Sequence, residues 1–225
     1  MKLRITVILG LLFLVSLANA QEKPVLKNPK EKVSYIIGMD IGNNLKKQAI
    51  DADPNSLLRG IQDALSGAKP LLSQEEIQET MVAFQKEMAE KQKQKGEAFL
   101  SENKKKEGVK TLPSGLQYKV IKAGTGKKPK SNDTVTVNYR GTLIDGTEFD
   151  SSFRRGQPAT FQVSGVIPGW TEAMQLMAEG AKWQLFIPPN LAYGERGAGG
   201  LIGPNATLIF EVELISVQEN KQDKK

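Results

Sequence analysis

The chain of 225 residues contains neither cysteine nor histidine. Without cysteine no disulfide can form, so each domain must be stabilised by the apolar surface that it buries. The sequence also lacks the histidine-based nucleophile pairs of hydrolases, zinc sites built from Cys and His, and most forms of haem ligation. Any chemistry must therefore come from carboxylates, hydroxyls, backbone groups or the shape of an apolar site, and we expect no metal and no cofactor.

The sequence also has little that points to nucleic acid. The formal net charge is +6, and the lysines gather in two segments, 91–106 and 221–225. These segments do not interleave basic residues with aromatic ones, as a nucleic-acid-binding face does. We therefore expect no nucleic-acid partner.

The first 20 residues have the three parts of a secretory signal peptide. Lys2 and Arg4 precede an apolar run over residues 5–15, and the triplet Ala18-Asn19-Ala20 offers a cleavage site. The alternative is an uncleaved membrane anchor, but the run is shorter than the ~20 residues that span a bilayer. We predict cleavage after Ala20, export, and no stable insertion into a membrane.

Residues 31–107 have helical periodicity, with apolar side chains recurring every three or four positions. In the first predicted helix this apolar face consists of Val33, Ile37, Ile41 and Leu45. A second helix is predicted between Asp53, a good N-cap, and Gly67, a common C-terminal residue. A third begins at Ser73, where Glu76 completes a capping box.

The third predicted helix changes character along its length. After Met88 its apolar residues become too sparse to cover a core. A helix continuing to about Lys105 would be ~48 Å long and would project into solvent, holding two domains apart. The alternative is a disordered, lysine-rich linker after Met88.

Three helices with one-sided apolar faces make a poor core for a monomer. The same faces suit a homodimer in which residues 31–90 of two chains pack together. The alternative is a small, self-contained helical hairpin.

From Ser114 onward the apolar period changes from helical to two, which indicates strands. Asp145-Gly146 is a hairpin-turn signal. The one helix predicted in this half is PGWTEAMQLM, residues 168–177. We expect an antiparallel, twisted sheet that curls over this helix and leaves an apolar cleft between them.

Four segments of the second half carry a family resemblance: VNYRGTL (137–143), EFDSSFRRG (148–156), VIPGW (166–170) and IPPNLAYGERGAGGLIGPNATLIFEVEL (187–214). Together they resemble the FK506-binding-protein (FKBP) family of peptidyl-prolyl isomerases. TLPSGLQYKVI (111–121) and the helical first half resemble the Mip-like or FkpA-like branch, named after the macrophage infectivity potentiator. The resemblance covers residues 30–217.

The resemblance and the periodicity together predict an α+β protein with an all-helical N-terminal dimerisation domain, a long connecting helix and a C-terminal FKBP domain. The predicted boundaries are a signal peptide at 1–20, a helical dimerisation region at 21–72, the connecting helix at 73–108, the isomerase domain at 109–217 and a charged tail at 218–225.

The resemblance also implies a binding pocket. Trp170 would be its floor, and its other apolar members would be Tyr139, Phe149, Phe161, Val166, Ile167, Tyr193, Ile202 and Phe210. Asp150 would be a buried carboxylate at the pocket edge, held by Tyr139 or Arg155, and would polarise the bound amide. Tyr193 and the backbone N–H of Ile167 would donate hydrogen bonds to substrate carbonyls. Taken singly, each large aromatic is more often a core residue.

Two positions depart from the best-known members of the family. Ala159 stands where those members often have an aromatic residue, and Ala198 where they often have a histidine. We expect both on the pocket rim, where they would affect substrate preference and macrolide binding more than catalysis.

The implied activity is cis-trans isomerisation of Xaa-Pro bonds in exported polypeptides, with FK506- or rapamycin-type macrolides as inhibitors. The alternative is a dimeric holdase chaperone in which isomerisation is incidental. Either activity fits the periplasm, while the outer-membrane surface and secretion are further possible locations.

Overall fold

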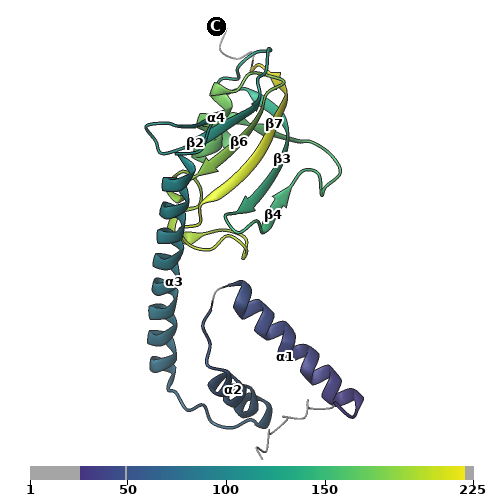
Figure 1. Ribbon diagram of the computed structural model, residues 1–225, viewed down its shortest axis with the longest axis vertical. Coiled ribbons are helices and arrows are strands. Elements are labelled where there is room, and N and C mark those ends of the chain that lie inside the picture. The colour runs from purple at the N-terminus through teal and green to yellow at the C-terminus, as the bar shows by residue number, and fades with distance from the viewer. Residues whose placement is uncertain (1–25, 49, 221–225) are drawn as a thin grey trace, which may run out of the picture. The chain divides into compact units, whose positions relative to one another are not determined.

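The computed structural model describes residues 26–48 and 50–220 and divides the chain into two compact units, residues 1–71 and 72–225 (Figure 1). The predicted signal peptide at 1–20, its cleavage site and the last residues of the charged tail lie outside the described residues. Each unit is described separately below.

The first unit contains two helices, α1 (Pro29–Lys47) and α2 (Pro54–Ser66). Asn28 caps α1 by accepting a hydrogen bond from the backbone N–H of Glu31. Asp53 caps α2 in the same way, and Gly67 ends it in the left-handed conformation with φ 69°, as the sequence predicted. Neither helix contains a buried residue, so the apolar faces predicted from the periodicity are not covered within one chain: Val33 and Ile37 are exposed, and Ile41 and Leu45 are only partly buried.

The second unit begins with the long helix α3 (Gln74–Asn103). The predicted capping box is present, because Ser73 and Glu76 each accept a hydrogen bond from the other's backbone N–H. The helix is continuous past Met88, which contradicts the alternative of a disordered linker. The expectation that its second half projects into solvent is wrong, since Gly96 and Asn103 are buried.

A seven-stranded antiparallel sheet follows, with the order β1-β2-β6-β7-β3-β4 and with β5 also paired to β3. Its strands are β1 (Val109–Thr111), β2 (Gln117–Lys122), β3 (Thr134–Leu143), β4 (Glu148–Ser151), β5 (Ala159–Gln162), β6 (Lys182–Ile187) and β7 (Leu208–Gln218). Helix α4 (Pro168–Leu176) lies against this sheet (Figure 1).

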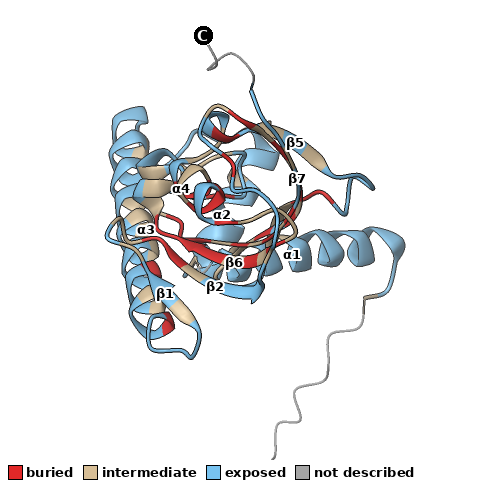
Figure 2. Cartoon of the chain, turned by 90° about the horizontal axis from the view of Figure 1, so that it is seen from above, coloured by how far each residue is buried: buried red, intermediate tan, exposed pale blue. Residues whose placement is uncertain are grey.

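The core forms where the sheet meets α4. Alternate residues of the strands point into it. In β3, Val135, Val137 and Tyr139 are at most 5% exposed, while their neighbours are not buried. In β7 the buried set is Leu208, Phe210, Val212 and Leu214. Helix α4 adds Trp170, Ala173 and Met174, so the buried residues concentrate between helix and sheet (Figure 2).

The predicted hairpin turn at Asp145-Gly146 is also present. Gly146 has φ 87°, a left-handed conformation that glycine adopts without strain. The Asp145 side chain accepts a hydrogen bond from the N–H of Thr147, and the N–H of Leu143 bonds the carbonyl of Thr147. The turn sends β4 back along β3 and thereby brings Asp150 opposite Gly141 and within hydrogen-bonding distance of Tyr139.

Candidate functional site

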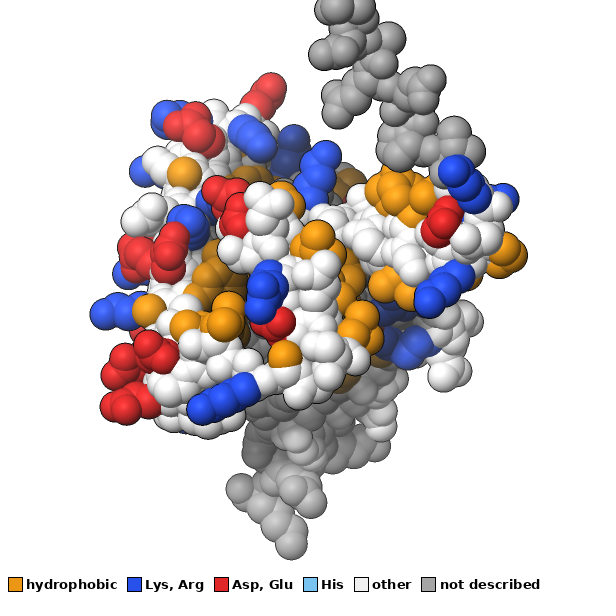
Figure 3. Space-filling view, turned by 90° about the horizontal axis from the view of Figure 1, so that it is seen from below, with side chains coloured by type: hydrophobic (Ala, Val, Ile, Leu, Met, Phe, Trp, Pro, Cys, Tyr) orange, Lys and Arg blue, Asp and Glu red, His pale blue; other side chains and the backbone are white. Residues whose placement is uncertain are grey.

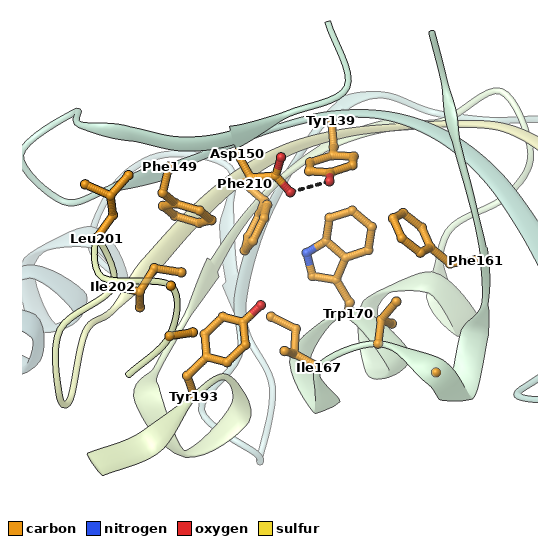
Figure 4. Close-up of a pocket in the computed structure, with 14 residues that line it drawn as sticks. Tyr139, Phe149, Asp150, Phe161, Ile167, Trp170, Tyr193, Leu201, Ile202 and Phe210 are labelled. Carbon is orange, nitrogen blue, oxygen red and sulfur yellow. Dashed lines mark hydrogen bonds between the residues drawn. The ribbon is translucent and has the colours of Figure 1, made fainter. Parts of the chain in front are cut away.

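A cavity of about 680 Å³ opens between the sheet, the start of α4 and the loop that leads into β7. Its walls are mostly aromatic and aliphatic (Figure 4). The lining residues are Tyr139, Phe149, Asp150, Phe161, Gly165, Val166, Ile167, Trp170, Tyr193, Ala198, Gly199, Leu201, Ile202 and Phe210.

Trp170 is the centre of the aromatic arrangement. Its ring makes edge-to-face contacts with Tyr139 and Phe210, each with centroids 5.2 Å apart, and with Phe161 at 5.9 Å. The side chain is 4% exposed. An aromatic box of this kind is a rigid apolar surface with few rotamers to lose when a ligand binds.

Backbone features place Trp170 at the bottom of the pocket. Pro168 occupies the first turn of α4 and fixes the direction in which the helix starts. A Cβ atom at Gly169 would lie 2.6 Å from a methyl carbon of Ile187, so only glycine lets the helix start this close to β6. Ile167 is the N-cap, and the helix's own hydrogen bonds leave its backbone N–H unused.

The aromatic wall contributed by the strands depends on Gly141. A Cβ atom there would come within 2.7 Å of the rings of both Phe149 and Phe210. These two rings pack edge to face with centroids 5.4 Å apart. The glycine of VNYRGTL therefore makes room for two pocket residues, a role that the sequence did not reveal.

Polar groups gather at one edge of the cavity. The Tyr139 hydroxyl donates to Asp150 Oδ2 at 2.5 Å, as the dashed line in Figure 4 shows. Arg155 donates to Asp150 Oδ1 at 2.5 Å and to the Tyr139 hydroxyl oxygen at 2.6 Å. The backbone N–H of Ser151 also bonds Oδ1 at 2.8 Å. The carboxylate is therefore fixed on both of its oxygens.

These contacts set the charge state of the site. Burial alone would raise the pKa of Asp150, but the hydrogen bonds from Tyr139 and Arg155 and the charge of Arg155 outweigh it, so this pKa lies below its usual value. Burial, followed by the bond to Asp150, raises the pKa of Tyr139. At neutral pH the pocket edge thus carries an ionised carboxylate and a protonated phenol.

Ten of the eleven site residues named from the sequence line this cavity. The exception is Arg155, which does not line the cavity itself but contacts the lining residues Tyr139 and Asp150. Asp150 was expected to be buried, but its side chain is 40% exposed, because it lies at the cavity mouth beside Arg155.

The two departures from the family pattern differ in position. Ala198 lines the cavity, as expected of a rim residue. Ala159 does not: it lies in β5 opposite Val137 and is not among the residues that line the cavity, so its placement on the rim was wrong. The lining residues that the sequence analysis missed are Gly165 and Leu201, which adjoin recognised motif positions but carried no chemical signal of their own.

Comparisons with known proteins agree with this geometry. Residues 125–215 match the family described as FKBP-type peptidyl-prolyl cis-trans isomerase, and residues 30–120 match the domain amino-terminal to such isomerases. The chain is 53% identical to the outer membrane protein MIP of Legionella longbeachae, over 97% of this chain and 98% of that protein. This chain belongs to the FKBP-type peptidyl-prolyl isomerase family.

Two further relatives are similar over most of the chain. The peptidyl-prolyl cis-trans isomerase Mip of Coxiella burnetii is 49% identical over 86% of this chain and 89% of its own. The crystal structure of FkpA from Escherichia coli is 43% identical, with a TM-score of 0.59, covering 86% of this chain and 99% of that one. The predicted family, the α+β fold with its FKBP domain, and the enzyme class are thus confirmed.

Two findings concern other classes of site. In the described part of the chain, no three acidic side chains gather in a way that could hold a metal ion. Within residues 26–48 and 50–220, no helix has both the length and the apolar character that crossing a membrane requires.

Proposed function

We propose that this isomerase acts on Xaa-Pro bonds of exported polypeptides, and that desolvation in the aromatic pocket and hydrogen bonds at its edge supply the rate enhancement. The observation that carries the proposal is the pairing of three aromatic rings packed around Trp170 with one anchored carboxylate at the pocket mouth.

The chemistry needs neither a nucleophile nor a metal. Rotation about the amide bond must overcome ~18–20 kcal/mol, because resonance holds the planar form. In the twisted transition state the nitrogen lone pair no longer conjugates with the carbonyl, so the group is less polar than the planar ground state. An apolar pocket therefore destabilises the planar form more, and each ~1.4 kcal/mol of difference is tenfold in rate.

The polar groups have distinct proposed roles. Asp150, held by Tyr139 and Arg155, polarises the bound amide from the pocket edge. Tyr193, which is 40% exposed at the cavity mouth, and the backbone N–H of Ile167 donate to substrate carbonyls (Figure 4). The apolar set that receives the proline ring, or a macrolide of the rapamycin type, is Phe149, Phe161, Val166, Trp170, Ile202 and Phe210.

The deciding experiment is the cis-to-trans relaxation of an Xaa-Pro peptide with and without rapamycin. We expect fast turnover that rapamycin blocks and that both Asp150→Ala and Tyr193→Phe weaken. Tyr118→Phe is the matched control, because Tyr118 stacks on Trp183 outside the cavity. If the two pocket variants match wild type, Asp150 and the Tyr193 hydroxyl do not contribute to turnover.

We propose that the chain forms a homodimer through its N-terminal helices. In α1 and α2 no described residue is buried, and large apolar side chains such as Ile36, Leu58 and Leu65 are 54–85% exposed. The space-filling view shows further apolar side chains at the surface (Figure 3). A second copy of the same faces would remove this apolar area from water.

Sedimentation of the mature chain tests the dimer. Twice the chain mass is expected for the full mature protein and a single mass for a variant that lacks residues 21–72. A monomeric full-length chain would favour the alternative of a self-contained hairpin.

The holdase is the second candidate, and the same exposed apolar faces favour it. If it is correct, the mature chain suppresses aggregation of an unfolded protein even when Asp150→Ala has lowered turnover. Suppression that falls in parallel with turnover would instead make the isomerase pocket responsible for both activities. We further propose the periplasm as the location, on the strength of the predicted signal peptide.

A further inference from the structure

The last third of α3 is packed onto the face of the sheet that points away from α4. Phe99 meets Phe186 of β6 with ring centroids 6.0 Å apart. The buried Asn103 donates from Nδ2 to Gln117 Oε1 at 3.0 Å, and Gln117 Nε2 donates to the carbonyl of Leu100 at 2.9 Å. This end of the helix is therefore an integral part of the isomerase unit.

At Gly96 the helix packs tightly against the segment that precedes β7. A Cβ atom there would lie 2.4 Å from Thr207 Oγ1 and 3.3 Å from Thr207 Cβ. Thr207 is fully buried, its Oγ1 has no hydrogen-bond partner, and it immediately precedes β7. Glycine at this position of α3 is thus what allows the helix to rest on the segment that connects the pocket loop to β7.

A second contact lies two residues earlier in that segment. Asn205 Nδ2 donates to the carbonyl of Ala89 in α3 at 3.4 Å. Its backbone N–H donates to the carbonyl of Gly194 at 2.8 Å, and Gly194 directly follows Tyr193. Asn205 therefore connects the helix to the residue beside a pocket tyrosine.

The backbone of Asn205 is unusual. Among the residues that the structure describes, it alone has a positive φ without being glycine, at 56°. Asparagine tolerates this conformation better than most residues, but it still costs energy unless the surroundings require it. Here the conformation lets one residue bond the loop through its backbone and the helix through its side chain.

Elsewhere the helix and the loop do not fill the space between them. A cavity of about 340 Å³ separates Lys93 and Glu97 of α3 from the loop segment 188–190 and from Gly194. The attachment of the loop to α3 thus depends on the contacts at Asn205 and Thr207. Within the loop, Ala198 and Ile202 exchange two backbone hydrogen bonds, and Gly197, Gly199 and Gly200 all have positive φ.

We infer that α3 positions the pocket loop, and that Asn205 is the positioning residue through which the helix holds Tyr193 at the mouth of the cavity. The inference rests on the proposed role of Tyr193 in turnover. In this arrangement α3 is more than a spacer between two domains: its residues 89–96 complete the support of the catalytic site.

Asn205→Gly in the full mature chain tests the inference. Glycine adopts φ 56° freely and keeps the backbone bond to Gly194, so only the bond to Ala89 is lost. We expect kcat/KM for an Xaa-Pro peptide to fall about threefold, as the loss of one neutral hydrogen bond implies. Gln94→Ala is the matched control, since Gln94 is exposed and bonds Glu90 within the helix.

A double-mutant cycle with Tyr193→Phe separates positioning from a general loss of structure. If Asn205 acts through Tyr193, Asn205→Gly has little further effect once the hydroxyl is gone. Additive effects of the two changes would overturn the inference. The inference is also overturned if Tyr193→Phe lowers kcat/KM but Asn205→Gly leaves it unchanged. In that case the proposed role of Tyr193 still stands.

A compensating pair gives a second, independent test. Gly96→Ala should displace α3 from Thr207 and lower kcat/KM, and adding Thr207→Ala should restore much of it, because the methyl group takes the place of Oγ1. Failure of Thr207→Ala to rescue would count against the inference. Alanine favours helix more than glycine does, so loss of the helix is not the cause of either result.

One readout does not depend on turnover. The chain has four tyrosines, so the ring signals of Tyr193 can be assigned by NMR in the labelled protein. We expect them to shift or broaden in Asn205→Gly and to stay in place in Gln94→Ala. If Tyr193→Phe leaves the rate unchanged, the proposed role of Tyr193 fails, and these signals alone decide whether α3 positions the loop.

Discussion

The two units of the chain bury their apolar side chains to opposite extents. In the second unit, Leu116, Leu185, Ile187 and Val212 are 0% exposed and belong to one continuous core. In α1 and α2 no residue is buried, although their helices are equally well capped. Good local signals therefore form helices in both units, but only the sheet and α4 enclose a core within one chain.

This difference is the reason for proposing a partner for the first unit. A sheet packed on a helix covers its apolar face with its own elements. Two helices of 19 and 13 residues cannot cover each other in this way, so their faces remain available to a second copy or to an unfolded client.

Among the variants that test this comparison, Leu185→Ala should have the largest effect, on the stability of the second unit. Leu185 is fully buried in β6, and removing its side chain leaves a cavity, so we expect the unfolding free energy of the second unit to fall by about 2–5 kcal/mol. Urea denaturation followed by tryptophan fluorescence measures the loss, since both tryptophans lie in this unit. Leu176→Ala, at a residue 37% exposed, is the matched control. Equal losses from both variants would contradict the assigned core.

Ile61→Glu addresses the first unit. If α2 packs against a second copy, a charge on its apolar face is desolvated without a partner, and the dissociation constant should rise about 100-fold. Gln62→Glu adds the same charge at the next position of the helix and should leave association nearly unchanged. Sedimentation equilibrium gives both constants. Turnover of a short peptide should stay at the wild-type level in both, and association that survives Ile61→Glu would place the dimer interface elsewhere.

Arg155→Ala tests whether polar anchoring in the second unit affects the rate. It removes the bonds to Asp150 and to the Tyr139 hydroxyl, so we expect kcat/KM to fall about three- to tenfold. The neighbouring Arg154→Ala should change less, because that side chain is 60% exposed, lies 4.0 Å from the carboxylate of Glu148, and donates only to the backbone carbonyl of Phe149. Equal activity of the two variants would mean that Asp150 needs no support from Arg155.

The pH dependence of the rate should be the smallest effect. The chain has no histidine, the pKa of Asp150 is lowered and that of Tyr139 is raised, so turnover should stay flat from about pH 5 to pH 9. The stabilisation from ionised Asp150 is present above its unfolded pKa of about 3.9 and is lost as pH falls through its lower folded pKa. For Tyr139 the stabilisation is present below its unfolded pKa of about 10 and is lost as pH rises through its higher folded pKa. A bell-shaped profile near neutrality would reveal an unrecognised titrating group.

Local signals were a good guide to the elements of both units. Asp53 and Gly67 mark the ends of α2, Ser73 and Glu76 the start of α3, and Asp145-Gly146 the turn between β3 and β4. These features act over a few residues, so the chemistry of the residues themselves decides them. The alternation of β3 and β7 likewise showed which side chains would face a core.

Contacts between distant segments were harder to predict. The sequence of α3 after Met88 is sparse in apolar residues, and we expected that part in solvent, yet Phe99 and a buried glycine are enough to seat it on the sheet. Asp150 was expected to be buried but lies half-exposed at the pocket mouth, and Ala159 packs against the core instead of lining the pocket. Each of these outcomes depends on which residues of a distant segment pack against the side chain in question.

The sequence by itself determined both ends of α2, the start of α3, the turn between β3 and β4, which faces are apolar, and which chemistry is absent, because capping, periodicity and composition are properties of short segments. Only the tertiary structure decided that β4 brings Asp150 to Tyr139 and Arg155, that Gly141 and Gly169 make room for the pocket rings, and that α3 supports the loop carrying Tyr193. Each of these features depends on contacts between different elements, and those contacts form only when the sheet, α3 and α4 pack together.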